Sequence, residues 1–105
     1  MNSPRRVLLT LEYDGTRFSG WQRQINGRSV QEEVETALLK ATRRPLKVTG
    51  ASRTDAGVHA LGQRAHFDTD AAIPDGKWPF VLNTLLPPDV RATGSLRVNP
   101  DLHAR

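Results

Sequence analysis

Four segments of the 105-residue chain alternate apolar and polar residues with a period of two, which is typical of half-buried β-strands. In the first segment, Val7, Leu9, Leu11 and Tyr13 share one face, whereas the other face is mixed, as expected for a central strand. In the last segment, Gly94 predicts a β-bulge. The four predicted strands span residues 5–13, 46–51, 61–67 and 89–99.

Two further segments follow the 3.6-residue period of amphipathic helices. The first begins with Ser29-Val30-Gln31-Glu32, a capping box with Ser at the N-cap and Glu at the third helical position. It ends at Arg43-Arg44-Pro45, because proline disfavours helical geometry in the residue before it. The second spans residues 77–86, with Trp78 on its apolar face and Pro79 in its first turn, where a proline is tolerated.

The resulting order is strand, helix, strand, strand, helix, strand. It predicts an α+β domain of the ferredoxin-like, split βαβ type, with two helices on one face of a four-stranded antiparallel sheet. RNA-recognition domains share this plan, but residues 62–67, Gly-Gln-Arg-Ala-His-Phe, do not match their base-stacking motif. The fold by itself therefore predicts no function.

Composition narrows the class of protein. The absence of cysteine excludes disulfides and thiolate metal sites. There is no apolar run of membrane-spanning length and no apolar signal segment near the N-terminus, so we expect a cytoplasmic protein without membrane contact. The net charge is +4, and arginine dominates the fifteen basic residues. Arginine binds phosphate in bidentate fashion and stacks on bases, which favours nucleic acid as the partner; genome composition or heat adaptation is the alternative origin of this bias.

The loop between the second and third predicted strands, residues 52–60, reads Ser-Arg-Thr-Asp-Ala-Gly-Val-His-Ala. It brings a carboxylate, a guanidinium and an imidazole together on a loop held by two strands, where catalytic groups commonly lie. Asp and Gly are also ordinary turn residues, and on local composition alone we favour the interpretation that this segment is only a turn. The histidines His59 and His66 have neither metal-ligand spacing nor a third ligand nearby, so we expect no zinc site.

A second polar loop, residues 16–28, interleaves aromatic residues with Arg and Gln. Such a segment can stack bases and bind phosphates. Alternatively, its aromatic residues attach a long loop to the core. We favour core packing for Phe18, and both roles stay open for Trp21.

The segment Arg53-Thr54-Asp55-Ala56-Gly57-Val58-His59 closely resembles the signature of the TruA family of tRNA pseudouridine synthases, which usually has Gly at the position of Ser52. Other family motifs follow in the same order, and together they cover nearly the whole chain from about Arg6. These motifs are Tyr13-Asp14-Gly15, residues 18–24, residues 29–32, Gly62-Gln63, residues 86–89 and His103-Ala104-Arg105.

The resemblance implies an isomerase that detaches uracil from its ribose, rotates it and rejoins it through a ring carbon, with no metal and no cofactor. It assigns the catalytic carboxylate to Asp55, as nucleophile or base. It assigns to Arg53 the support of a flipped-out base, and Arg53 can also keep Asp55 ionised by pairing with it. Thr54, Gly57 and His59 are expected to shape the loop, with RNA contact as the alternative role of His59.

The resemblance also implies a partner and an architecture. The partner is tRNA, modified at positions 38 to 40 of the anticodon stem-loop by a homodimeric full-length enzyme. We expect residues 1–105 to form the single N-terminal catalytic domain, without the family's C-terminal half, and to be poorly active alone. Resemblance makes Arg17, Arg23 and Gln24 candidates for RNA contact, and Trp21 and Arg64 complete the set.

Two alternatives belong to other functional classes. The first is a non-catalytic, ferredoxin-like RNA-binding module, for which Asp55→Asn would leave function unchanged. The second is a protein-interaction or regulatory domain with no affinity for RNA. Neither alternative requires the Arg53-Thr54-Asp55 loop together with the segment 13–24.

Overall fold

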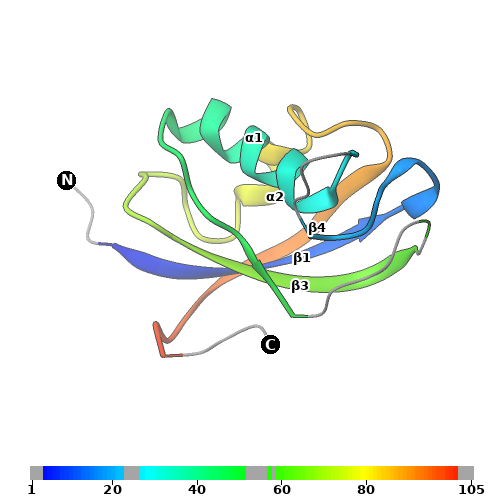
Figure 1. Cartoon of the computed structure of the whole chain (residues 1–105). Coiled ribbons are helices and arrows are strands. Elements are labelled where there is room, and N and C mark those ends of the chain that lie inside the picture. Colours follow the sequence, from blue (N-terminus) through cyan, green and yellow to red (C-terminus); the bar gives the residue numbers. More distant parts are fainter. Residues whose placement is uncertain (1–3, 23–26, 52–56, 58, 102–105) are drawn as a thin grey trace.

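A computed structural model describes residues 4–22, 27–51, 57 and 59–101 of the chain. Its strands form one antiparallel sheet in the order β2-β3-β1-β4, and both α-helices pack on the same face of that sheet (Figure 1). This arrangement confirms the predicted ferredoxin-like fold. The elements are β1 (Arg5–Tyr13), a 3-10 helix η1 (Gly15–Arg17), α1 (Val30–Thr42), β2 (Thr49–Gly50), β3 (Ala60–Thr69), α2 (Trp78–Leu82) and β4 (Val90–Val98).

The core lies between the sheet and the two helices. Val7, Leu9 and Leu11 of β1 are fully buried, which confirms the predicted inner face of this strand. Trp78 of α2 is also fully buried, and its ring meets Phe67 of β3 edge-on, with the ring centroids 4.9 Å apart. The helices add Val30, Val34, Ala37, Leu38 and Leu82 to this cluster.

The ends of α1 agree with the capping signals in the sequence. The Ser29 hydroxyl oxygen accepts a hydrogen bond from the Glu32 N–H at 3.1 Å, as a capping box requires. At the other end, Arg43 adopts a left-handed conformation with φ 60°, and its N–H donates to the Leu39 carbonyl at 2.7 Å. The helix therefore ends just before the predicted Arg43-Arg44-Pro45 stop.

The second strand is shorter than the predicted 46–51, because only Thr49 and Gly50 pair with β3. The backbone of Val48 bonds to side chains of α1 instead. Its N–H donates to the Glu35 carboxylate at 2.9 Å, and its carbonyl accepts from the Gln31 amide at 3.1 Å. These contacts satisfy polar backbone groups at the edge of the sheet, where unpaired groups would invite pairing with other chains.

At the opposite edge of the sheet, a side chain likewise bonds to backbone groups of the edge strand, β4. The Asn83 side chain donates to the Ala92 carbonyl at 2.9 Å and accepts from the Ala92 N–H at 2.8 Å. Asn83 directly follows α2, which ends at Leu82 and is shorter than the predicted 77–86. The N–H groups of Leu85 and Leu86 both donate to the Leu82 carbonyl, so the chain continues here in turns.

Replacing Asn83 tests the importance of this edge contact. Asn83→Ala removes both hydrogen bonds to Ala92, and we expect the free energy of unfolding in urea to fall by about 1 kcal/mol. Thr84→Ala is the matched control, because Thr84 is exposed and its hydroxyl bonds the Val81 carbonyl, three residues earlier in the chain. An equal loss in both variants would show that the contact does not stabilise the sheet.

Two irregularities in strand pairing fix which side chains reach the core. Between β1 and β4, Thr10 pairs with Gly94 and Leu11 with Ala92, which leaves Thr93 as an extra residue and confirms the predicted bulge. A second shift lies between β1 and β3: Leu11 pairs with Gln63 and Tyr13 with Ala60, so Leu61 and Gly62 together face the single residue Glu12. Leu61 is therefore 87% exposed instead of sharing the buried face of Gln63, Ala65 and Phe67 as the simple alternation predicted.

Candidate active site

The catalytic candidates Arg53, Thr54 and Asp55 lie outside the described residues, but the chain on either side of them is placed. Before the loop, the Ala51 N–H donates to the Arg64 carbonyl of β3 at 2.7 Å. After it, the Gly57 N–H donates to the Phe18 carbonyl at 3.2 Å. The loop therefore leaves the sheet edge at Ala51 and returns against the segment that follows β1.

Gly57 has a conformational reason to be glycine. Its φ is +79°, in the left-handed region that residues with a Cβ rarely adopt. A Cβ at this position would meet no other atom within 4 Å, so the constraint comes from the backbone and not from crowding. That Gly57 shapes the loop stays a prediction, and this conformation gives a physical reason for it.

The turn that receives the loop begins at Asp14. Its side-chain oxygen Oδ1 accepts hydrogen bonds from the Thr16 hydroxyl at 2.6 Å and from the Thr16 N–H at 3.0 Å, which caps η1. These two bonds lower the pKa of Asp14 below its ordinary value, and the nearby His59 and Arg17 act in the same direction. Asp14 is therefore ionised at neutral pH.

His59 joins the end of the loop to this turn. Its Nδ1 atom accepts a hydrogen bond from the Gly15 N–H at 2.9 Å, and the same nitrogen lies 3.1 Å from Oδ1 of Asp14. Nδ1 can use one partner at a time: the Gly15 N–H when the imidazole is neutral at this atom, and the Asp14 carboxylate when Nδ1 is protonated. Either state holds His59 on the turn.

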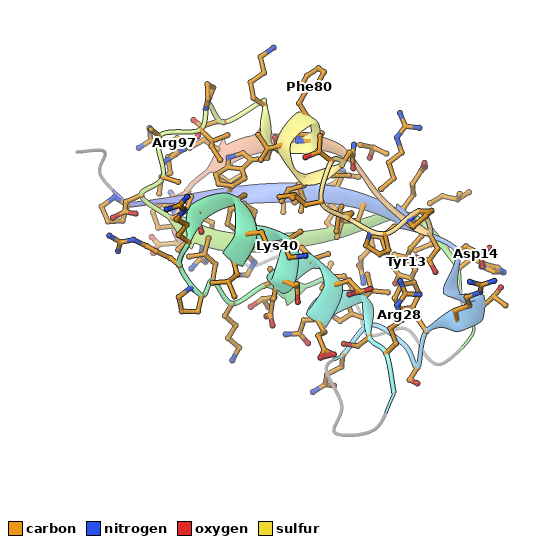
Figure 2. All side chains as sticks on the ribbon, turned by 90° about the horizontal axis from the view of Figure 1, so that it is seen from above. Tyr13, Asp14, Arg28, Lys40, Phe80 and Arg97 are labelled. Carbon is orange, nitrogen blue, oxygen red and sulfur yellow. The ribbon has the colours of Figure 1, made fainter. Side chains whose placement is uncertain are left out.

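Arg28 stabilises the surroundings of this turn. The sequence alone did not single it out. Its guanidinium pairs with both oxygens of Asp89, at 2.8 and 3.1 Å, and with the Glu33 carboxylate at 2.8 Å. It also lies over the Phe18 ring, 4.3 Å from the centroid. The hydrogen bond to Asp89 is the main cause of a raised pKa of Arg28. Tyr13, Asp14 and Arg28 lie together at one end of the molecule (Figure 2).

A hollow of about 520 Å³ opens where the loop rejoins β3. Tyr13, Ala60 and Pro88 give it an apolar part, and polar and charged groups surround that part. Sites for small ligands and bases commonly combine these features. Its lining residues are Glu12, Tyr13, Asp14, His59, Ala60, Leu61, Pro88, Asp89 and Arg91.

Within the described part of the chain, no three His, Asp or Glu residues are grouped so that they could hold a metal ion. None of the described helices is both long and apolar enough to cross a membrane.

The chain matches known proteins over nearly its whole length. A family model described as tRNA pseudouridine synthase matches residues 10–104. The chain belongs to the tRNA pseudouridine synthase family. The match extends from the middle of β1 to beyond β4, and it includes η1, the loop 52–58 and His59.

Individual members of the family give the same result. The chain is 50% identical over 101 residues to tRNA pseudouridine synthase A of Ruminiclostridium cellulolyticum, covering 96% of this chain and 41% of that protein. It is 50% identical over 100 residues to the protein of that name from Aeromonas hydrophila, covering 95% and 37%. With its Thermosynechococcus vestitus namesake it shares 47% identity over 103 residues, covering 98% and 36%. The chain thus spans about two-fifths of the length of these relatives.

Five residues of this pseudouridine synthase chain are predicted to contact RNA, and three of them lie among the described residues. Arg17, in η1, and Arg64, in β3, are exposed. Trp21 is only 3% exposed, and its indole lies so close to Gly50 that an added Cβ would stand 2.6 Å from it. This burial favours the packing role for Trp21 over base stacking. Arg23 and Gln24 lie outside the described residues.

Proposed function

We propose that this chain is the catalytic N-terminal domain of an enzyme that converts uridine to pseudouridine in tRNA, at positions 38 to 40 of the anticodon stem-loop. The observation that carries the proposal is the match to the tRNA pseudouridine synthase family across residues 10–104, which includes the loop with Asp55. The setting of that loop supports it, because backbone hydrogen bonds hold the chain at Ala51 before it and at Gly57 in its returning part, and His59 and Ala60, where the loop ends, line an open hollow.

The reaction breaks the bond between N1 of uracil and C1′ of ribose and forms a bond between C5 and C1′. The proton on C5 goes to solvent, and N1 gains one, so the conversion balances without an oxidant or a reductant. A carboxylate beside C1′ can serve as the nucleophile or as the base that moves a proton. We assign this role to Asp55.

The target uridine lies within a stacked stem-loop, so it must leave the stack before a loop residue can reach it. We assign to Arg53 the task of filling the space that the base leaves. Three exposed arginines lie in parts of the fold that contact the described ends of the loop. The Arg64 carbonyl accepts from the Ala51 N–H, Arg91 lines the hollow together with His59, and Arg17 belongs to the η1 turn that binds His59. Their charge suits binding of the phosphate backbone.

Three further parts of the proposal concern the whole protein. The relatives are longer than this chain, and the part of the full-length protein outside residues 1–105 supplies the opposite wall of the RNA-binding cleft. The full-length enzyme acts as a homodimer in the cytoplasm. Residues 1–105 alone bind tRNA weakly and turn over little, because one wall of the cleft is missing.

The experiment that tests this function measures release of tritium from tRNA transcripts labelled at C5 of uridine, with purified full-length protein. We expect release from an anticodon arm that carries uridines at positions 38 to 40, because the C5 proton goes to solvent during the reaction. The control transcript has cytidine at those three positions and labelled uridines elsewhere. Equal release from both transcripts would contradict the proposed site, and binding without release would favour an RNA-binding module.

A further inference from the structure

Asp14 has no part in the proposed chemistry, yet it lies where the loop with Asp55 meets the rest of the domain. Its carboxylate accepts two hydrogen bonds from Thr16, and these bonds fold residues 14–17 into the η1 turn. The turn presents the Gly15 N–H to Nδ1 of His59. The side chain of Asp14 therefore fixes the position of the Gly15 N–H that donates to His59.

The same turn holds the returning arm of the loop at a second point. The Phe18 N–H donates to the Gly15 carbonyl at 3.0 Å, and the Phe18 carbonyl accepts from the Gly57 N–H at 3.2 Å. Gly57 and His59 are two and four residues after Asp55. Two contacts so close in sequence hold Gly57 and His59 to the turn, shortly after Asp55 in the chain.

The turn is itself fixed to the sheet. The Asp14 N–H donates to the Asp89 carbonyl at 3.0 Å, and the carboxylate of Asp89 is held by Arg28. Asp14 thus links a rigid support to the arm of the loop through backbone and side-chain contacts. Catalytic groups on loops depend on such supporting contacts, because a small displacement of the reacting group is costly.

We propose that Asp14 is a positioning residue of the enzyme, which acts through His59 to fix the arm of the loop that carries Asp55. This inference rests on the proposed function, because it assumes that Asp55 performs the reaction. Asp14 itself touches neither the substrate nor the reacting atoms. Loss of the Asp14 side chain should lower kcat, because the carboxylate of Asp55 is then misplaced relative to the bound tRNA. The affinity for tRNA should change little.

Two substitutions at Asp14 separate turn geometry from other effects. Asp14→Ala removes the acceptor of both Thr16 hydrogen bonds, and we expect kcat of the full-length enzyme to fall about tenfold, with KM for tRNA changed less than about twofold. Asp14→Asn keeps an amide oxygen at the same place, so we expect kcat within about threefold of wild type. An unchanged kcat in Asp14→Ala, or a raised KM alone, would overturn the inference.

A double-mutant cycle with His59 tests the route of the effect. His59→Phe removes the acceptor of the Gly15 N–H and should lower kcat about as much as Asp14→Ala does. If Asp14 acts through His59, the double variant loses little more than either single variant, because residues in one network are not additive. A loss of about a hundredfold in the double variant, the product of the two single effects, would show that Asp14 acts independently of His59.

A readout that needs no activity separates this inference from the proposed function. Trypsin cleavage after Arg53 in the folded full-length protein, followed by mass spectrometry, should speed up about tenfold in Asp14→Ala and His59→Phe and stay near wild type in Asp14→Asn. Cleavage after Arg91, in β4, is the internal reference. Unchanged cleavage after Arg53 would overturn the role of Asp14. Faster cleavage in a protein whose wild type never forms pseudouridine would overturn the proposed function instead.

Discussion

Asp55→Asn in the full-length protein should lower kcat for pseudouridine formation at least about a thousandfold. The amide has nearly the shape of the carboxylate, but it can neither attack a carbon nor accept a proton at neutral pH. Affinity for tRNA should change by less than about threefold, because the carboxylate makes no favourable contact with a polyanion. Single-turnover formation of pseudouridine and a separate filter-binding assay measure the two quantities.

Asp70→Asn is the matched control for this prediction. It changes the same chemical group in the turn that follows β3, and its activity should equal that of wild type. Asp55→Ala is measured in parallel, because slow deamidation of an introduced Asn would restore the original carboxylate. An Asp55 variant that kept a tenth or more of the wild-type rate would show that this carboxylate does not perform the reaction.

Trp78→Ala should produce the largest loss of stability. Trp78 is fully buried between α2 and β3, and truncating a buried tryptophan typically costs about 3–5 kcal/mol. A small domain is stable by only about 5–15 kcal/mol, so this variant loses a large part of the total. Urea unfolding followed by circular dichroism measures the loss in the free energy of unfolding.

A second substitution at Trp78 makes this prediction more specific. Among the described residues, the indole N–H of Trp78 is a buried donor with no hydrogen-bond partner. Trp78→Phe removes that unsatisfied group together with part of the ring, so we expect a smaller cost, about 1–2 kcal/mol. Phe80→Ala is the control, because Phe80 is 71% exposed on the same helix and should cost less than about 0.5 kcal/mol. Similar losses for Trp78→Ala and Phe80→Ala would contradict the assignment of Trp78 to the core.

The fold could be predicted from the sequence wherever local signals agree with the packing. Alternation in residues 5–13 and the capping box at Ser29 identified β1 and the start of α1, since both depend on residues close in sequence. The exposure of Leu61 could not be predicted, because it follows from a shift in pairing with β1. The short length of β2 could not be predicted either, because the Val48 N–H bonds to Glu35 of α1 and not to a neighbouring strand.

The chemistry of the candidate site could be predicted from the sequence, but the contacts that hold the site in place could not. Resemblance to a family pointed to Asp55 and to the residues around it. The pairing of Arg28 with Asp89 joins residues 61 positions apart, and the contact of Gly15 with His59 joins residues 44 apart. No periodicity or local motif encodes such contacts, because they exist only once the sheet has brought the ends of β1, β3 and β4 together. The signal that could have drawn attention to Arg28 is its place just before the capping box, opposite the acidic residues of the first helical turn.

The most direct test of the central claim uses cells that lack the full-length gene. They are complemented with wild type or with Asp55→Asn at matched protein levels, and pseudouridine is mapped at positions 38 to 40 of their tRNAs. We predict that wild type restores the modification and that the variant leaves these positions as uridine. Restoration by both would contradict the claim, because the loop 52–58 would then be a turn without a catalytic role.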